Sequence, residues 1–357
     1  MELASFSPRA AAERSGIARE SALPPDLWRG LEGSALARLL AQVPIPSRSP
    51  ALAGLLGRAL ATKPEGARGE TAMRIAALEW AGQVNRADRH ARTGRRAGAL
   101  AAYALALLAA GRNDEACAVQ LGTGQADGAA KRASFLIPAY CAAASGDKDA
   151  ARNALDIARD SGVDVAFAAR AIAGQGARGP LPRSVDVLDY LFLKLGQSAN
   201  RPDIAAKAGP ELLFLLARDD EALPELRVAA AERAAALNII DGETLATVYL
   251  DAAPRPPKSA QSPAALRAKL FASLEAQTSE KIRAESIDAL LASGKDARIE
   301  IPMAQAMAQS NVLQDTQAAS FAETSVRVAA LAGDDQTAWD LTESGRRPAC
   351  AAGNCCW

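Results

Sequence analysis

The sequence predicts an all-α protein, and three of its features support that fold class. Alanine and leucine dominate the apolar residues, and aromatic residues make up only 4% of the chain. Because alanine and unbranched side chains lose little conformational freedom on entering a helix, this composition favours helices. Apolar residues recur at steps of three and four, which is the spacing of one helix face. No segment shows sustained alternation of apolar and polar residues, so we expect no sheet.

The clearest helical pattern runs through residues 97–162. A first apolar run ends at Gly111, and the chain resumes on Asn113 and two acidic residues. A second apolar run ends at Gly146 and resumes on Asp147. Glycine suits the left-handed position just past a helix end, and Asn or Asp suits the N-cap of the helix that follows. The pattern therefore predicts two helix–turn–helix hairpins.

Upstream of these hairpins, the chain begins with residues 1–24, which lack strong apolar periodicity and which we expect to be disordered. Ordered structure then starts with a bulky anchor at Trp28, followed by a short helix over 34–43. Ser49 followed by Pro50 is the pairing of an N-cap with the first position of a helix, so another helix is expected to begin there.

The hairpin turn recurs along the chain. Two further helices are predicted at 72–81 and 85–92, separated by Gly82. An alanine follows five residues after each turn glycine, in the pairs Gly82 and Ala87, Gly111 and Ala116, Gly146 and Ala151, and Gly333 and Ala338. The first three glycines are 29 and 35 residues apart, which falls within the range of helical-repeat arrays.

Downstream, two breaker-rich segments punctuate further apolar helical runs. The first is 174–183 and the second is 253–263. The helices expected between and after them cover 184–195, 211–217, 224–237, 244–250, 264–276, 280–292, 303–308 and 320–331, with Ser262 and Ser279 as N-caps. We therefore expect an N-terminal helical block over 25–175, a C-terminal block over 184–345 and a flexible tail over 346–357.

The hairpin turns GRNDEA (111–116), GDKDAA (146–151) and GDDQTA (333–338) resemble the turn of a tetratricopeptide repeat. The resemblance covers the turn only, because the early aromatic residue and the closing proline of that family are missing or displaced. It implies a degenerate, tetratricopeptide-like α-solenoid of antiparallel helical hairpins. Arrays of this kind present a concave surface that usually binds peptides or proteins.

The stretches PPDLWRGL, IPSRSPAL and YCAAASGDKDAA are similar to parts of large, uncharacterised, alanine-rich helical proteins of Gram-negative bacteria. This second resemblance implies a bacterial origin and repeated helical hairpins. It brings no activity and no site residues. Some of those proteins are thought to be exported.

Charge and hydropathy narrow the choice of partners. Lysine plus arginine and aspartate plus glutamate each number 41, so a neutral chain is a poor bulk binder of nucleic acid. No apolar run approaches the length that crosses a bilayer, so we expect no membrane span. Without a signal segment at Met1, the chain as given is expected in the cytoplasm, and in the periplasm if an upstream signal peptide is missing.

The cysteines leave two alternatives open. Cys117 and Cys141 lie on the two predicted hairpins and are either small buried thiols or partners in a disulfide. A disulfide would place the protein in an oxidising compartment. Cys350, Cys355 and Cys356 crowd the tail without the CxxC spacing of a metal or redox site.

One charged cluster stands out, around His90, the single histidine. It consists of Arg86, Arg89, Arg92, Arg95 and Arg96. These arginines form either an ordinary solvated helix face or a docking patch for an acidic partner or phosphate.

No motif predicts a catalytic site, a cofactor or a metal. The GQGARG segment at 174–179 has the glycine spacing of a dinucleotide site, but it follows a helix and runs into prolines, so we interpret it as a linker. One histidine cannot form an HExxH zinc site. The acidic runs at 219–221 and 334–335 are expected to serve as N-caps or solvated turns.

These observations favour a non-enzymatic scaffold that binds proteins or peptides, acting at the bacterial envelope. One alternative is a helical accessory domain of a system that acts on the cell wall, such as a lytic enzyme. Another is a helical enzyme without a recognisable motif. The sequence does not give the oligomeric state.

Overall fold

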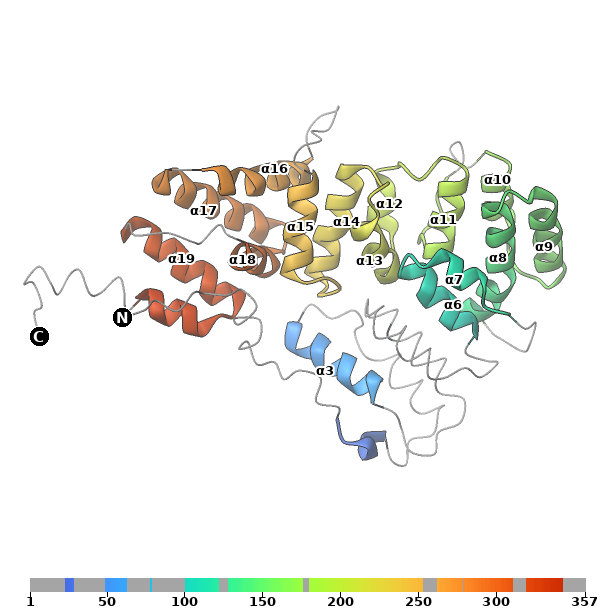
Figure 1. Ribbon diagram of the computed structural model, residues 1–357, viewed down its shortest axis with the longest axis horizontal. Helices are drawn as coiled ribbons and strands as arrows, with labels where there is room; N and C mark the ends of the chain where they lie inside the picture. The colour runs from blue at the N-terminus through green and yellow to red at the C-terminus, as the bar shows by residue number, and fades with distance from the viewer. Residues whose placement is uncertain are drawn as a thin grey trace, which may run out of the picture. The chain divides into compact units, whose positions relative to one another are not determined.

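The computed structural model describes residues 23–28, 49–62, 78, 100–121, 128–175, 180–252, 262–277, 279–310 and 319–342. Throughout these ranges the regular structure is helical, which confirms the predicted all-α class (Figure 1). The nearest approach to a strand in them is an isolated bridge between Val185 and Ala208. The described residues fall into two compact units, one ending at Ile239 and one beginning at Ile240.

The N-terminal unit is built around α11, whose residues from Val187 to Leu193 are all buried. Helices α6, α8, α10 and α13 pack against it. Further pairs in this unit are α6 with α7, α8 with α9, and α13 with α14. Its elements are a 3-10 helix (Pro25–Trp28), α3 (Pro50–Ala61), α6 (Leu100–Ala109), α7 (Asn113–Cys117), α8 (Gly128–Ala144), α9 (Lys148–Asp160), α10 (Ala166–Ile172), α11 (Val187–Leu195), α12 (Asp203–Lys207), α13 (Pro210–Arg218) and α14 (Pro224–Ala236).

The C-terminal unit packs α15 against both α16 and α18, and α19 against both α17 and α18. Its helices are α15 (Gly242–Ala252), α16 (Pro263–Ala276), α17 (Glu280–Asp296), α18 (Glu300–Gln309) and α19 (Ala319–Ala332), and the chain is helical again over 335–342. Aromatic rings of Tyr249 and Phe271, 5.3 Å apart, fill the space between α15 and α16.

The boundary between the two units lies at residues 239–240, whereas the sequence analysis placed the junction of its two blocks at 176–183. Helices α10 and α11 flank that earlier position and pack against each other. The breaker-rich segment therefore connects two helices of the same unit. Glycine and proline are common both in turns inside a unit and at boundaries between units, so they do not distinguish the two.

Helices end in the predicted glycine turn. Gly111, Gly146 and Gly333 all have positive φ, between 76° and 85°. At Gly146 the glycine N–H donates to the carbonyl of Ala143 (3.1 Å), and the N–H of Asp147 donates to Ala142 (2.9 Å). This pair of hydrogen bonds is the Schellman motif, which satisfies carbonyls left unpaired at a helix end.

The same motif recurs at ends that the sequence analysis did not identify. It closes α9 and α10 at Gly162 and Gly174, and it closes α11, α14 and α17 at residues with side chains. Those three residues are Gln197, Asn238 and Arg298, with φ of 52°, 55° and 61°. One turn geometry therefore ends eight helices in the described part of the chain.

The predicted N-caps are mostly correct. The side chains of Ser49, Asp147 and Ser262 each accept a hydrogen bond from a backbone N–H in the first turn of the following helix. Ser279 occupies the N-cap position of α17, but its side chain makes no capping hydrogen bond. The prediction for Asn113 was wrong by one residue, because the N-cap of α7 is Arg112 and has no side-chain capping bond.

Other predictions fall partly or wholly outside the described residues. The anchor Trp28 is buried, and its indole Nε1 donates to the carbonyl of Ala59 on α3 (3.1 Å). Within the two helices expected at 72–81 and 85–92, the structure describes only Leu78, which is helical and buried. The predicted helix over 34–43, the N-terminal segment up to residue 22 and the tail from 346 lie outside the described ranges.

Small residues let particular helices approach closely. Ala116 and Ala151, each five residues after a turn glycine, are fully buried, whereas Ala338 is half-buried. The closest approach involves Gly242 at the start of α15. A Cβ atom placed there would lie 2.6 Å from Cβ of Gln305 and 2.7 Å from the backbone nitrogen of Ala306, both on α18.

Candidate functional site

A cluster of ionisable side chains surrounds the first turn of α11. Asp186 is the N-cap, and its Oδ1 accepts from the N–H of Asp189 (2.8 Å). In return, Oδ2 of Asp189 accepts from the N–H of Asp186 (3.3 Å), which completes a capping box. The box lacks the usual sequence signature of Ser or Thr followed three residues later by Glu, because both capping residues are aspartates.

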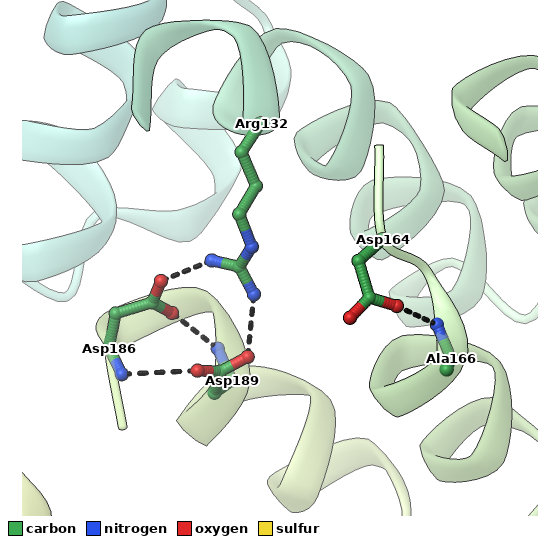
Figure 2. Close-up of polar contacts among 5 residues, drawn as sticks. All are labelled: Arg132, Asp164, Ala166, Asp186 and Asp189. Atoms are coloured by element: carbon green, nitrogen blue, oxygen red, sulfur yellow. Dashed lines mark hydrogen bonds and ion pairs between the residues drawn. The ribbon is translucent and has the colours of Figure 1, made fainter. Parts of the chain in front are cut away.

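Arg132 on α8 reaches into this capping box, as Figure 2 shows. Its Nη2 donates to Oδ1 of Asp189 (2.6 Å), and its Nη1 pairs with Oδ2 of Asp186. Figure 2 also draws a separate, exposed bond in which Oδ1 of Asp164 accepts from the N–H of Ala166 (3.0 Å) at the start of α10. The guanidinium thus joins α8 to both carboxylates of the α11 cap.

Burial and the neighbouring charges shift the pKa values in this cluster in opposite directions. Burial raises the pKa of Asp189 to about 6, and the nearby charge of Asp186 adds to that rise, while Arg132 lowers it. Burial alone would lower the pKa of Arg132, but the two carboxylates outweigh it and the pKa is raised. Arg132 therefore stays protonated, and it partly offsets the cost of a buried negative charge on Asp189.

Glu211, in the first turn of α13, is a third carboxylate in this region, and the sequence analysis did not identify it. Burial raises its pKa to about 7, and the charge of Asp186 contributes to the rise. Its Oε2 is buried and has no hydrogen-bond partner. Its Oε1 would lie 2.8 Å from a Cβ at Gly209, so glycine there makes room for the side chain. The sequence offers no signal for this site, because acidic residues are common in the first turn of a helix.

A second polar network ties the other end of α11 to the end of α13. The hydroxyl of Tyr190 donates to Oδ2 of Asp219 (2.7 Å), and Nζ of Lys194 lies 3.0 Å from the same oxygen. Lys194 also pairs with Glu221 at 2.8 Å. The expectation that the acidic run 219–221 is an N-cap or a solvated turn was wrong for Asp219, whose side chain is 9% exposed. Asp334 does act as an N-cap, accepting from the N–H of Thr337 (3.1 Å).

This second network holds its members in their ordinary charge states. Burial pushes the pKa of Asp219 upward, but hydrogen bonds from Tyr190 and Lys194 outweigh burial, so the pKa lies below its usual value. Burial and the bond to Asp219 raise the pKa of Tyr190. A catalytic acid or base works best with a pKa near the working pH, and both shifts move away from neutrality. The network is suited to joining helices.

The remaining predicted sites fall in different places. Cys117 and Cys141 are joined in a disulfide with Cα atoms 5.6 Å apart, and Cys117 is exposed. The arginine cluster 86–96 and His90 lie outside the described residues. Of the GQGARG segment, Gly174 closes α10, and no strand precedes it in the part of the chain that the structure describes.

Within the described ranges, no three His, Cys, Asp or Glu side chains are grouped so that they could hold a metal ion. Among the same residues, no helix has both the length and the apolar content needed to cross a membrane. No family model, curated protein or solved structure matches this chain.

Proposed function

We propose that this protein is a non-enzymatic scaffold of the helical-repeat type that binds a protein or peptide partner. The observation that carries this proposal is the repeated Schellman turn, which closes eight of the described helices with the same pair of backbone hydrogen bonds. Repetition of one helix–turn unit is the signature of arrays that stack helix pairs, and such arrays expose extended binding surfaces.

The chemistry of three half-buried ionisable groups is that of contacts that join helices, as expected for a scaffold. Arg132, Lys194 and Asp219 each contact a charged partner on another element, and their pKa shifts favour the charged form. In enzymes, ionisable groups are usually shifted toward neutrality at a site that substrate reaches. Asp189 and Glu211 are shifted in that direction by burial, and Asp189 is paired with Arg132 inside the α11 cap.

An exposed tryptophan gives the proposal a residue to test. Trp339 lies in the helical segment 335–342 and is 61% exposed. Tryptophan is enriched among the residues that dominate protein interfaces, because its large ring buries much area at low entropic cost. Ile157 on α9, in the other unit, is 58% exposed and offers a matched apolar control.

The disulfide favours the envelope as the site of action. Disulfides persist in oxidising compartments such as the bacterial periplasm and are rare in the cytosol. The bond between Cys117 and Cys141 is therefore easier to reconcile with an exported protein than with a cytosolic one.

The test is capture of a partner by the full chain, immobilised and exposed to an envelope extract of a Gram-negative bacterium. We expect a protein that binds saturably when purified, and roughly tenfold weaker binding to Trp339→Ser than to Ile157→Ser. Recovery of peptidoglycan fragments instead would favour the accessory domain of a cell-wall system. Absence of any saturable binder would contradict both the scaffold and the accessory-domain proposals.

A further inference from the structure

We propose that the disulfide between Cys117 and Cys141 is a redox-sensitive staple for α7. Reduction by a dithiol would release this short helix from α8, while the rest of the N-terminal unit remains folded. This inference concerns the fold alone and does not depend on the scaffold proposal.

Helix α7 buries little apolar surface of its own. It has five residues, and its N-cap, Arg112, makes no capping hydrogen bond, although its side chain pairs with Glu115 of the same helix. Ala116 is its one buried residue, and Asp114, Glu115 and Cys117 are exposed. The Oδ1 atom of Asn113 is buried without a hydrogen-bond partner, which is a further cost. An isolated helix of this length is unstable in water, so α7 depends on its attachments.

The other side of the bond is firmly packed. Cys141 lies in α8, a helix of 17 residues that packs against α6, α9 and α11. The neighbouring Tyr140 is buried, and its ring stands edge-on to Phe192 of α11 with centroids 6.0 Å apart. Arg132 anchors the same helix to the α11 cap. Breaking the disulfide therefore leaves α8 in place and frees the α7 side.

The two cysteines differ in exposure. Cys117 is exposed and Cys141 is half-buried, so the proposed reduction begins at Cys117. The reductant thiolate bonds to Sγ of Cys117, and Cys141 leaves as a thiolate that takes up a proton. The second thiol of the reductant then displaces Cys117, which is protonated in turn. The protein gains two electrons and two protons, and the dithiol becomes a disulfide.

Release of α7 would uncover apolar surface. Helix α7 packs against α6, and Ala116 of α7 is fully buried. Opening of the staple would thus couple the redox state of one exposed bond to the accessibility of the α6 face. Local openings of this kind occur without global unfolding when a segment has few buried contacts.

The experiment is hydrogen exchange followed by mass spectrometry on the full chain, with and without dithiothreitol. To leave only the two staple cysteines, the protein carries Cys350→Ser, Cys355→Ser and Cys356→Ser. We expect amides of residues 112–121 to exchange at least about tenfold faster after reduction, and those of α11 and α13 to change less than about twofold. Reoxidation should restore protection.

A second variant adds Cys117→Ser and Cys141→Ser, and it should show the fast exchange at 112–121 whether or not reductant is present. Two results would overturn the proposal. One is unchanged exchange at 112–121 after the bond has been shown to be reduced. The other is a loss of protection spread over α8, α11 and α13, because the bond would then hold the whole unit.

Discussion

Arg132 on α8 donates a hydrogen bond of 2.6 Å to Asp189 on α11, across 57 positions of sequence. Asp189 is buried, and its remaining carboxylate oxygen bonds to the backbone of the α11 cap. The pair therefore helps to join α8 to α11, the helix at the centre of the N-terminal unit. A buried ion pair contributes little net stability, but removing one partner leaves a costly unpaired charge.

Replacing Arg132 by methionine should destabilise the protein in a pH-dependent way. At about pH 8 Asp189 is ionised and would lack its cation, so we expect a loss on the order of 2–3 kcal/mol in the free energy of unfolding. Since the pKa of Asp189 is raised to about 6, the carboxyl is largely neutral near pH 5, and the loss there should be smaller. Urea unfolding at the two pH values measures both numbers.

The control is Arg152→Met, which removes an exposed arginine that pairs with Asp149, both on α9. Exposed pairs of this kind contribute roughly 0.3–0.5 kcal/mol, with little dependence on pH in this range. Equal losses for the two variants, or a loss at Arg132 that is the same at both pH values, would show that Asp189 is not the partner that matters.

Glu211→Gln should stabilise the protein at alkaline pH. The pKa of Glu211 is raised from 4.5 to about 7 in the folded state, so the stability that its neutral form provides is complete below 4.5 and is lost as the pH rises through 7. Glutamine keeps the shape without the charge, and we expect a gain on the order of 1–3 kcal/mol near pH 8.

The gain from the same substitution should shrink to less than about 1 kcal/mol near pH 5, where Glu211 is protonated when folded but still largely ionised when unfolded. Chemical denaturation at both pH values tests this, with the exposed Glu243→Gln in the first turn of α15 as a control. A stabilisation that does not change with pH would point to packing rather than charge as its origin.

Gly242→Ala should disrupt the contact between α15 and α18. The added Cβ would lie 2.6 Å from Cβ of Gln305 and 2.7 Å from the nitrogen of Ala306, and backbone atoms cannot move aside cheaply. We expect a loss of roughly 2–3 kcal/mol in the unfolding free energy. The comparison is Gly54→Ala in α3, where nothing lies within 4 Å and alanine should stabilise the helix by about 0.5–1 kcal/mol. Thermal unfolding by circular dichroism would distinguish the two.

Arg298→Gly should stabilise the turn after α17. Arg298 has φ of 61°, a left-handed conformation that costs a side-chain-bearing residue roughly 1–2 kcal/mol. Part of the gain is lost because glycine is more flexible in the unfolded chain, so about 0.5–1 kcal/mol should remain. Gly146→Ala, with φ of 85° and open space around it, is the reverse experiment and should destabilise by about 1 kcal/mol. A destabilising Arg298→Gly would mean that its side chain contributes more than the strain costs.

Local features of the fold could be predicted from the sequence because their signals are local. Gly146 followed by Asp147 encodes both a helix end and the next helix start within two residues, and the structure has both. Ser49 with Pro50 works in the same way. At Gln197 and Arg298 the residue in the left-handed conformation is not glycine, so the local sequence carries no sign of the turn.

The ionisable clusters were not predictable from the sequence for a different reason. Arg132 and Asp186 are separated by 54 residues, and nothing in the sequence shows that α8 lies beside α11. Glu211 looks like an ordinary acidic residue in a first helical turn, and only burial by surrounding helices raises its pKa. The cysteine pair left two alternatives open, and the structure contains the disulfide.

A double-mutant cycle between Arg132 and Asp189 tests most directly the claim that the buried charges join helices rather than serve a ligand. We predict that Arg132→Met destabilises the protein by about 2–3 kcal/mol, and by less than about 1 kcal/mol when Asp189→Asn is already present, leaving a coupling of at least roughly 1 kcal/mol. Residues kept for a ligand are often unfavourable for the fold. Stabilisation by each single change, with no coupling between them, would contradict the account.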